Sequence, residues 1–121
     1  MAKDDYDVIV YRVLVYLYAC MKREIIYQDA TFQASVRKNV DSDEYFTDAL
    51  RMMQTEGLIE GLAFVKAWGN DTIMLSRFQD AKITAQGIRY LMENTRMKQI
   101  GAKLKESVDI ISKLAGILML F

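Results

Sequence analysis

The sequence contains no histidine, no proline and only one cysteine among its 121 residues. Zinc sites built from His and Cys, acid–base catalysis by His and disulfide frameworks are therefore excluded. The 16 basic residues are balanced by 16 acidic ones, which argues against a strongly polybasic nucleic-acid binder. Cys20 stands inside an apolar segment with no second thiol, so we interpret it as a small core residue.

Phosphate-binding glycine loops are absent as well, because the six glycines match neither the GxGxxG nor the GKS/T spacing. The acidic pairs Asp4–Asp5 and Asp43–Glu44 stand at expected helix starts, where the helix dipole favours negative charge. A Ser or Thr nucleophile would have no His to activate it. We therefore expect a protein that is not an enzyme and that needs neither a metal nor a cofactor.

Long apolar runs are missing too. The longest charge-free stretches are 13–21 and 114–121, nine and eight residues long. A helix that crosses a membrane needs about 20 apolar residues. The first seven residues are acidic, which is the wrong charge for a secretory signal. These features predict a cytoplasmic protein without a membrane span.

The composition, 52% hydrophobic and 26% charged, is that of a globular domain, and the length suits one such domain. Residues 4–22 are rich in β-branched and aromatic side chains, which favour a strand. However, Val10, Leu14, Leu17 and Met21 recur at helical spacing. We therefore predict a mostly buried helix over this segment.

The next segments carry local helix signals of different strength. Residues 24–27 resemble a short extended piece, and a short helix is expected from Asp29 through Lys38. Residues 41–44, Asp-Ser-Asp-Glu, have the form of a capping box, in which the N-cap side chain accepts from the third helical residue and the Glu44 side chain bonds back to the cap. Gly57 stands where a left-handed residue ends a helix. Between them lies an amphipathic stripe formed by Phe46, Ala49, Leu50 and Met53. The sequence thus predicts a third helix over residues 43–56.

Two strands follow, over 58–67 and 72–78, and the polar residues between them predict a β-hairpin with its tip at 68–71. Residues 79–82 are expected to connect this hairpin to a helix that Thr84 caps and that ends near Asn94. Residues 95–120 form a long amphipathic helix in this interpretation. Its apolar stripe comprises Met97, Ile100, Leu104, Val108, Ile111, Leu114 and Ile117.

Three helices followed by a hairpin form the winged helix-turn-helix arrangement. We predict an α+β, mostly helical fold, with a winged-helix domain over residues 1–95 and an additional long C-terminal amphipathic helix over 96–121. The third helix takes the position of the recognition helix. A two-stranded hairpin must lean on this helical core, because it is not stable alone.

Three segments also carry a family resemblance: Gln54–Gly61, Ile83–Leu91 and Tyr11–Leu14. With the trailing amphipathic helix they resemble the YjcQ-like family, small winged-helix proteins often encoded by bacteria and their prophages. The resemblance covers roughly residues 6–110. It implies the fold, and it supplies no active-site residue to carry over.

Binding to DNA is the first functional expectation from this fold. The third helix carries one basic residue, Arg51, against four acidic ones, which opposes contact with phosphates. Candidates for nucleic-acid contact nevertheless lie in or near the turn before this helix, on the helix and on the hairpin arms: Arg37, Lys38, Thr47, Arg51, Gln54, Lys66 and Arg77. For each of them a solvated surface position is the competing interpretation.

A partner interface is the second expectation, because residues 115–121 are apolar nearly all round and such a helix must be buried. We predict a homodimer through the C-terminal helices; burial within the chain, a different protein and, least of all, a membrane surface are the alternatives. The interface candidates are Trp68, Leu104, Val108, Ile111, Leu114, Ile117, Leu118 and Phe121.

The leading hypothesis is therefore a prophage-type, DNA-binding transcriptional regulator or accessory factor that acts as a dimer on double-stranded DNA. The alternative is a protein–protein interaction module that kept the winged-helix scaffold and lost the basic reading surface.

Overall fold

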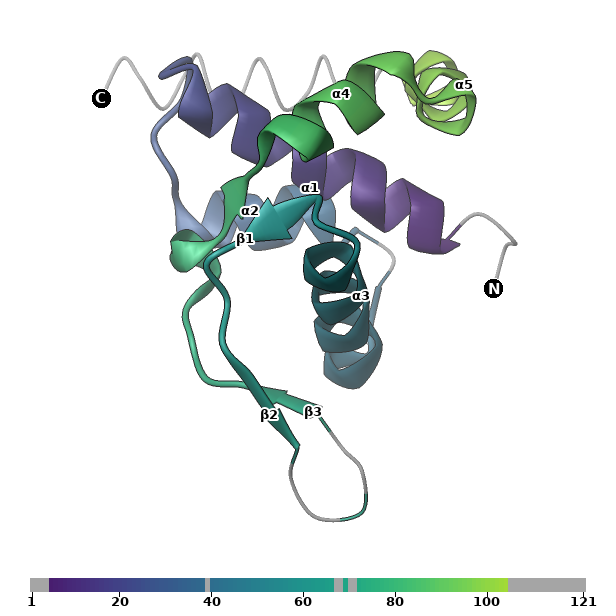
Figure 1. Cartoon of the computed structure of the whole chain (residues 1–121). Helices are drawn as coiled ribbons and strands as arrows, with labels where there is room; N and C mark the ends of the chain where they lie inside the picture. Colours follow the sequence, from purple (N-terminus) through teal and green to yellow (C-terminus); the bar gives the residue numbers. More distant parts are fainter. Residues whose placement is uncertain (1–4, 39, 67–68, 70–71, 105–121) are drawn as a thin grey trace.

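The computed structural model describes residues 5–38, 40–66, 69 and 72–104. Within these ranges the chain is a mostly helical α+β protein (Figure 1). Its helices are α1 (Asp5–Met21), α2 (Asp29–Val36), α3 (Asp43–Thr55), α4 (Ala85–Glu93) and α5 (Thr95–Lys103). The strands are β1 (Ile59–Glu60), β2 (Phe64–Lys66), β3 (Thr72–Met74) and β4 (Lys82–Ile83), and the 3-10 turn η2 covers Phe78–Asp80.

Helix α1 lies at the centre of the molecule and packs against α2, α3, α4, α5 and β4 (Figure 1). Burial on several sides explains why a segment of strand-forming residues is a helix, since packing overrides propensity. The prediction of a buried helix here is confirmed. The side chains of α1 that are at most 4% exposed are Ile9, Val10, Val13, Leu14, Tyr16 and Leu17.

A hydroxyl group on α1 fixes the connection to α2. The buried Tyr16 hydroxyl donates to the Gln28 carbonyl over 3.3 Å, and the Gln28 N–H donates to the same hydroxyl over 3.2 Å. Phe32 of α2 packs edge-on against the Tyr16 ring, with the ring centroids 5.2 Å apart. The short predicted helix is thus present, and it ends at Val36 rather than Lys38.

Helix α3 confirms the predicted third helix, but its cap differs from the prediction. Ser42 is the N-cap and accepts from the Tyr45 N–H over 3.1 Å. The third helical residue is therefore Tyr45 and not Glu44, so the expected reciprocal bond from Glu44 was wrong. At the other end Gly57 has the left-handed φ of 81° that the sequence predicts, and the Leu58 N–H bonds the Met53 carbonyl.

The strands form two short antiparallel pairs rather than one continuous hairpin. β2 pairs with β3 near the tip, and β1 pairs with β4 next to the helices, with Ile59 opposite Ile83. The predicted strands 58–67 and 72–78 are thus too long. The predicted connector 79–82 instead contains the end of η2 and the start of β4. Phe78 explains this interruption, because its ring packs against Phe32 and Phe46 in the core.

The two last described helices close over α1. Thr84 caps α4 as predicted, accepting from the Gly87 N–H over 2.9 Å, and Asn94 caps α5 by accepting from the Met97 N–H over 3.1 Å. Met97 and Ile100 of α5 are buried in the common core. The predicted continuation of this helix to residue 120 lies outside the described residues. The same holds for the part of the predicted C-terminal segment 96–121 that follows Leu104.

In the described part of the chain, no helix combines the length and the apolarity needed to cross a membrane.

Candidate functional site: the third helix and the hairpin

Gln54 ties α3 to the hairpin instead of facing solvent. Its side-chain Nε2 donates to the Leu62 carbonyl over 2.8 Å, and its Oε1 accepts from the Leu62 N–H over 2.9 Å. Leu62 itself is buried and lies between β1 and β2. This geometry argues against the prediction that Gln54 contacts a base edge, because both polar ends of its amide are used inside the protein.

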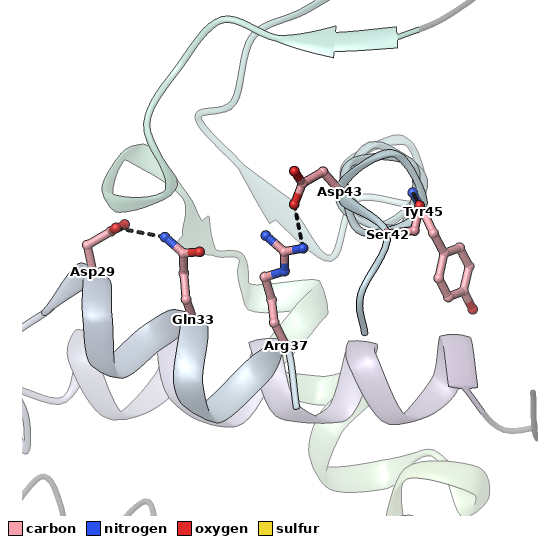
Figure 2. Close-up of polar contacts among 6 residues, drawn as sticks. All are labelled: Asp29, Gln33, Arg37, Ser42, Asp43 and Tyr45. Carbon is pink, nitrogen blue, oxygen red and sulfur yellow. Dashed lines mark hydrogen bonds and ion pairs between the residues drawn. The ribbon is translucent and has the colours of Figure 1, made fainter. Parts of the chain in front are cut away.

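Arg37 is likewise engaged within the chain. Figure 2 shows Asp29, Gln33 and Arg37 on the same side of α2 and its end, with Arg37 reaching Asp43 at the start of α3. The Arg37 guanidinium also lies over the Phe46 ring, 5.1 Å from its centroid. Its side chain is 18% exposed, whereas that of Asp43 is 85% exposed. Arg37 therefore joins α2 to the start of α3 and offers little charge to a phosphate.

Arg51 and Lys66 line a shared groove between α3 and the hairpin. The groove has a volume of about 440 Å³. It is lined by Asp48, Arg51, Phe64, Val65, Lys66 and Thr72. Arg51 Nε lies 4.0 Å from the Asp48 carboxylate, which makes an ion pair without a hydrogen bond. The structure thus brings together two of the predicted nucleic-acid candidates.

The remaining candidates lie apart from this groove. The Lys38 side chain is exposed after α2, while its backbone carbonyl accepts from Arg12 Nη1 over 3.0 Å. Thr47 is half-buried on α3. Arg77 is exposed where β3 leads into η2, and it lines a different pocket with Asp29 and Phe78. The seven predicted residues therefore do not form one basic patch.

The outward face of the hairpin is apolar, and this was missed at the sequence level. Val65 and Ile73 are opposite each other in the β2–β3 register and are 42% and 48% exposed. Leu75, two residues after Ile73, is 66% exposed, and Ala63 is exposed as well. We call these four residues the hairpin face. The sequence signal for this face was the alternation of side chains along residues 63–66 and 72–75. Ala63, Val65, Ile73 and Leu75 point to one side, whereas Phe64 and Met74 pack on the core.

The predicted interface residues fall largely outside the described part of the chain. Only Leu104 belongs to it; this residue is half-buried and packs on the core after α5. The other seven, Trp68, Val108, Ile111, Leu114, Ile117, Leu118 and Phe121, lie outside the described residues. The predicted dimer contact is therefore not tested by this structure.

Two polar groups on α1 are shielded from solvent, the Arg12 side chain and the Tyr6 hydroxyl. Arg12 is 7% exposed, and desolvation lowers the pKa of its guanidinium. For Tyr6, burial and then the nearby Glu56 carboxylate raise the pKa to about 12. Its buried hydroxyl has no hydrogen-bond partner among the described residues. Both groups act in the architecture of the core; neither lines the groove.

Comparison with known proteins gives one result. The model of the family described as YjcQ protein matches residues 11–110 of this chain. No curated protein and no solved structure matches the chain.

Proposed function

The chain belongs to the YjcQ protein family, and on that premise we propose that it is a non-enzymatic winged-helix protein that acts by binding another protein through its hairpin. The order of elements supports the winged-helix assignment. Residues 37–42 connect α2 to α3, and the β2–β3 hairpin follows α3 in the chain after β1 and projects away from the helices (Figure 1).

The exposed hairpin face is the observation that carries the proposed function. Three aliphatic side chains that are 42 to 66% exposed stand together with Ala63 on one side of β2 and β3. None of the four is charged, although the wing of a DNA-binding protein faces phosphates. A contiguous apolar surface on a small protein typically marks an interaction site.

The size of the hairpin face favours a short segment of a different protein over a second folded copy. A stable interface buries about 800 Å² on each partner. Four partly exposed aliphatic side chains supply only a fraction of that area. A dimer formed through this face alone is therefore not expected, and the homodimer that we propose uses the C-terminal residues instead.

The protein-binding proposal is tested by charging the hairpin face. The full-length chain, Leu75→Asp and Met92→Asp serve as baits in a lysate of host cells, and recovered proteins are quantified. Met92 is the matched control, because it is also apolar and is 51% exposed, on α4. We expect a protein that the unaltered chain and Met92→Asp both retain and that Leu75→Asp loses, and its purified form to bind in titration. Equal recovery with all three baits would contradict the proposal.

A second candidate function is the dimeric, prophage-type regulator that binds DNA. The side chains of Lys38 and Lys66 are exposed on the turn before α3 and on β2, and Arg51 lies on α3 between them in the sequence. Against this stand Asp43, Glu44 and Asp48 in the first half of α3, which would repel phosphates.

Fluorescence titration of labelled random and cognate-genome duplexes at about 50 mM salt separates the two functions. Asp43→Asn is the informative variant, because it removes a carboxylate and releases Arg37 from its ion pair. DNA binding at micromolar protein that tightens in Asp43→Asn would favour the regulator. The absence of binding by both proteins would eliminate it.

A further inference from the structure

We propose that the groove between α3 and the hairpin binds the carboxylate of an Asp or Glu side chain, presented by an extended apolar segment of the partner protein. This inference rests on the proposed function and names the chemistry of the partner. It is carried by an arginine that is not hydrogen-bonded to its neighbouring carboxylate, a second cation in the same groove, and an apolar lining that includes Val65 of the hairpin face.

Arg51 supplies the primary contact. Its Nε atom is buried, and it makes no hydrogen bond with any residue that the structure describes. Asp48 lies 4.0 Å away, which is beyond hydrogen-bond distance. Because this nitrogen is closed to solvent, a ligand oxygen contacts the exposed part of the Arg51 side chain, whose charge Asp48 does not neutralise through a hydrogen bond. The planar guanidinium donates in a fork that matches a carboxylate, while its side chain remains 42% exposed and therefore accessible.

Lys66 gives the groove its net charge. With Arg51 it supplies two positive charges against the single negative charge of Asp48, and all three residues line the same groove. The groove therefore attracts an anion. Thr72, also in the lining, adds a hydroxyl group that donates or accepts a hydrogen bond.

The apolar part of the lining determines what flanks the carboxylate. Phe64 and Val65 form this part, and Val65 also belongs to the hairpin face with Ile73 and Leu75. A bound segment that places its acidic side chain in the groove thus brings apolar neighbours to Phe64 and Val65. An extended segment suits this layout, because its side chains alternate between two faces.

One carboxylate fits this surface better than a polyphosphate does. Duplex DNA carries one negative charge per about 1.7 Å, so a phosphate in the groove brings further phosphates close to α3. Asp43 and Glu44 are exposed in the first turn of that helix. A peptide with a single acidic residue meets no such repulsion.

The test is a titration of the full-length, isotope-labelled chain followed by backbone amide chemical shifts. Two capped five-residue peptides are compared: serine–leucine–glutamate–leucine–serine and the same peptide with glutamine in the centre. They differ only in charge. We expect the glutamate peptide to shift the amides of Arg51, Lys66 and Thr72 and to bind about tenfold more tightly than the glutamine peptide. Added salt should reduce this difference.

Three substitutions test the location of the contact. Arg51→Gln should abolish the preference for glutamate and leave weak binding of both peptides to the hairpin face. Arg89→Gln, which removes an exposed arginine from α4, should bind like the unaltered chain. Lys66→Gln removes the second positive charge from the groove and should also weaken binding of the glutamate peptide. The spectrum of each variant shows whether the variant is folded.

The remaining outcomes overturn the inference in distinguishable ways. Equal binding of both peptides, sensitive to Leu75→Asp and not to Arg51→Gln, would reject the carboxylate site and leave the proposed function standing. Shifts at Arg51 and Lys66 with a short duplex, but with neither peptide, would assign the groove to a phosphate. No response to either peptide would reject the site, while the lysate experiment tests the proposed function separately.

Discussion

The side-chain amide of Gln54 bonds both backbone groups of Leu62, donating to its carbonyl over 2.8 Å and accepting from its N–H over 2.9 Å. These two bonds form where the chain leaves β1 and has not yet entered β2, so no strand partner satisfies Leu62 there. The Gln54 side chain thus takes the place of the strand-to-strand hydrogen bonds that Leu62 does not make, and it attaches this arm of the hairpin to α3.

Substitution of Gln54 should loosen this attachment. Gln54→Ala leaves two backbone groups of a buried residue without their partners, and we expect it to lower the free energy of unfolding by about 1–3 kcal/mol. Gln54→Glu should also destabilise, because a carboxylate cannot donate to the Leu62 carbonyl. Urea denaturation measures both, with Gln99→Ala on the exposed side of α5 as the control. A Gln54→Ala variant as stable as Gln99→Ala would contradict this role.

Gly87 should not tolerate a side chain, although it lies in a helix. A Cβ atom at this position would stand 2.2 Å from the Leu58 carbonyl oxygen and 2.9 Å from Ile83 Cγ1. Gly87→Ala should therefore destabilise by about 1–3 kcal/mol, despite the helix propensity that alanine adds. Thermal unfolding followed by circular dichroism measures the change.

Gly101→Ala is the matched control for that experiment. Its Cβ atom would approach only the end of a side chain, the Tyr11 hydroxyl at 3.0 Å, which can shift. We expect Gly101→Ala to be nearly neutral. Similar melting temperatures for the two variants would show that the close approach of α4 to Leu58 is not rigid.

Stability should fall at alkaline pH, in part through Tyr6. Burial raises the pKa of this phenol from 10.0 to about 12, so the folded state binds its proton more tightly than the unfolded state does. This contribution is fully present below pH 10 and is lost as the pH rises from about 10 to about 12. Tyr6→Phe should reduce the loss of stability over that range. It should not abolish the loss, because the pKa values of Tyr11, Tyr16 and Tyr90 are also raised and these residues still lose their protons more readily in the unfolded state.

The same variant also carries a prediction at neutral pH. The Tyr6 hydroxyl is buried without a hydrogen-bond partner in the described part of the chain, so its removal should leave the stability unchanged or raise it. Urea denaturation at pH 7 and at steps up to pH 11 tests both statements. A destabilised Tyr6→Phe with an unchanged alkaline profile would refute them.

The proposed homodimer is tested by shortening the chain. Light scattering should give the full-length chain twice the monomer mass of 14.0 kDa, and a chain ending at Glu106 the mass of a monomer. The apolar residues after that point supply the contact in this proposal. Leu75→Asp should leave the mass unchanged, because the hairpin face is assigned to a different partner. Equal association states for the long and short chains would refute the C-terminal interface.

The helices could be predicted from the sequence because their signals are local. The Gly57 stop, the Thr84 cap and the periodicity of α1 each lie within a few residues of the structure they specify. The family resemblance over residues 6–110 agrees with the match of the family model over 11–110.

The candidate site depended on contacts between distant residues, and the sequence could not supply them. Gln54 is eight residues from Leu62, and Arg12 lies 26 residues before the Lys38 carbonyl that it bonds. Propensity also favoured a strand up to residue 78, whereas core packing of Phe78 ends it earlier. The acidic character of α3 was visible in advance, but the pairing of Arg37 with Asp43 required the fold.

The division of the strands into two separate pairs has a consequence for how this family can diversify. The β1–β4 pair is built into the helical core through Ile59 and Ile83, whereas β2 and β3 are joined to it by Leu62 on one arm and Phe78 on the other. Among the described residues between these two anchors, Phe64 and Met74 pack on the core, and the positions beside them can change in chemistry while the core keeps its packing. Relatives that recognise different partners are therefore expected to differ most between positions 63 and 77.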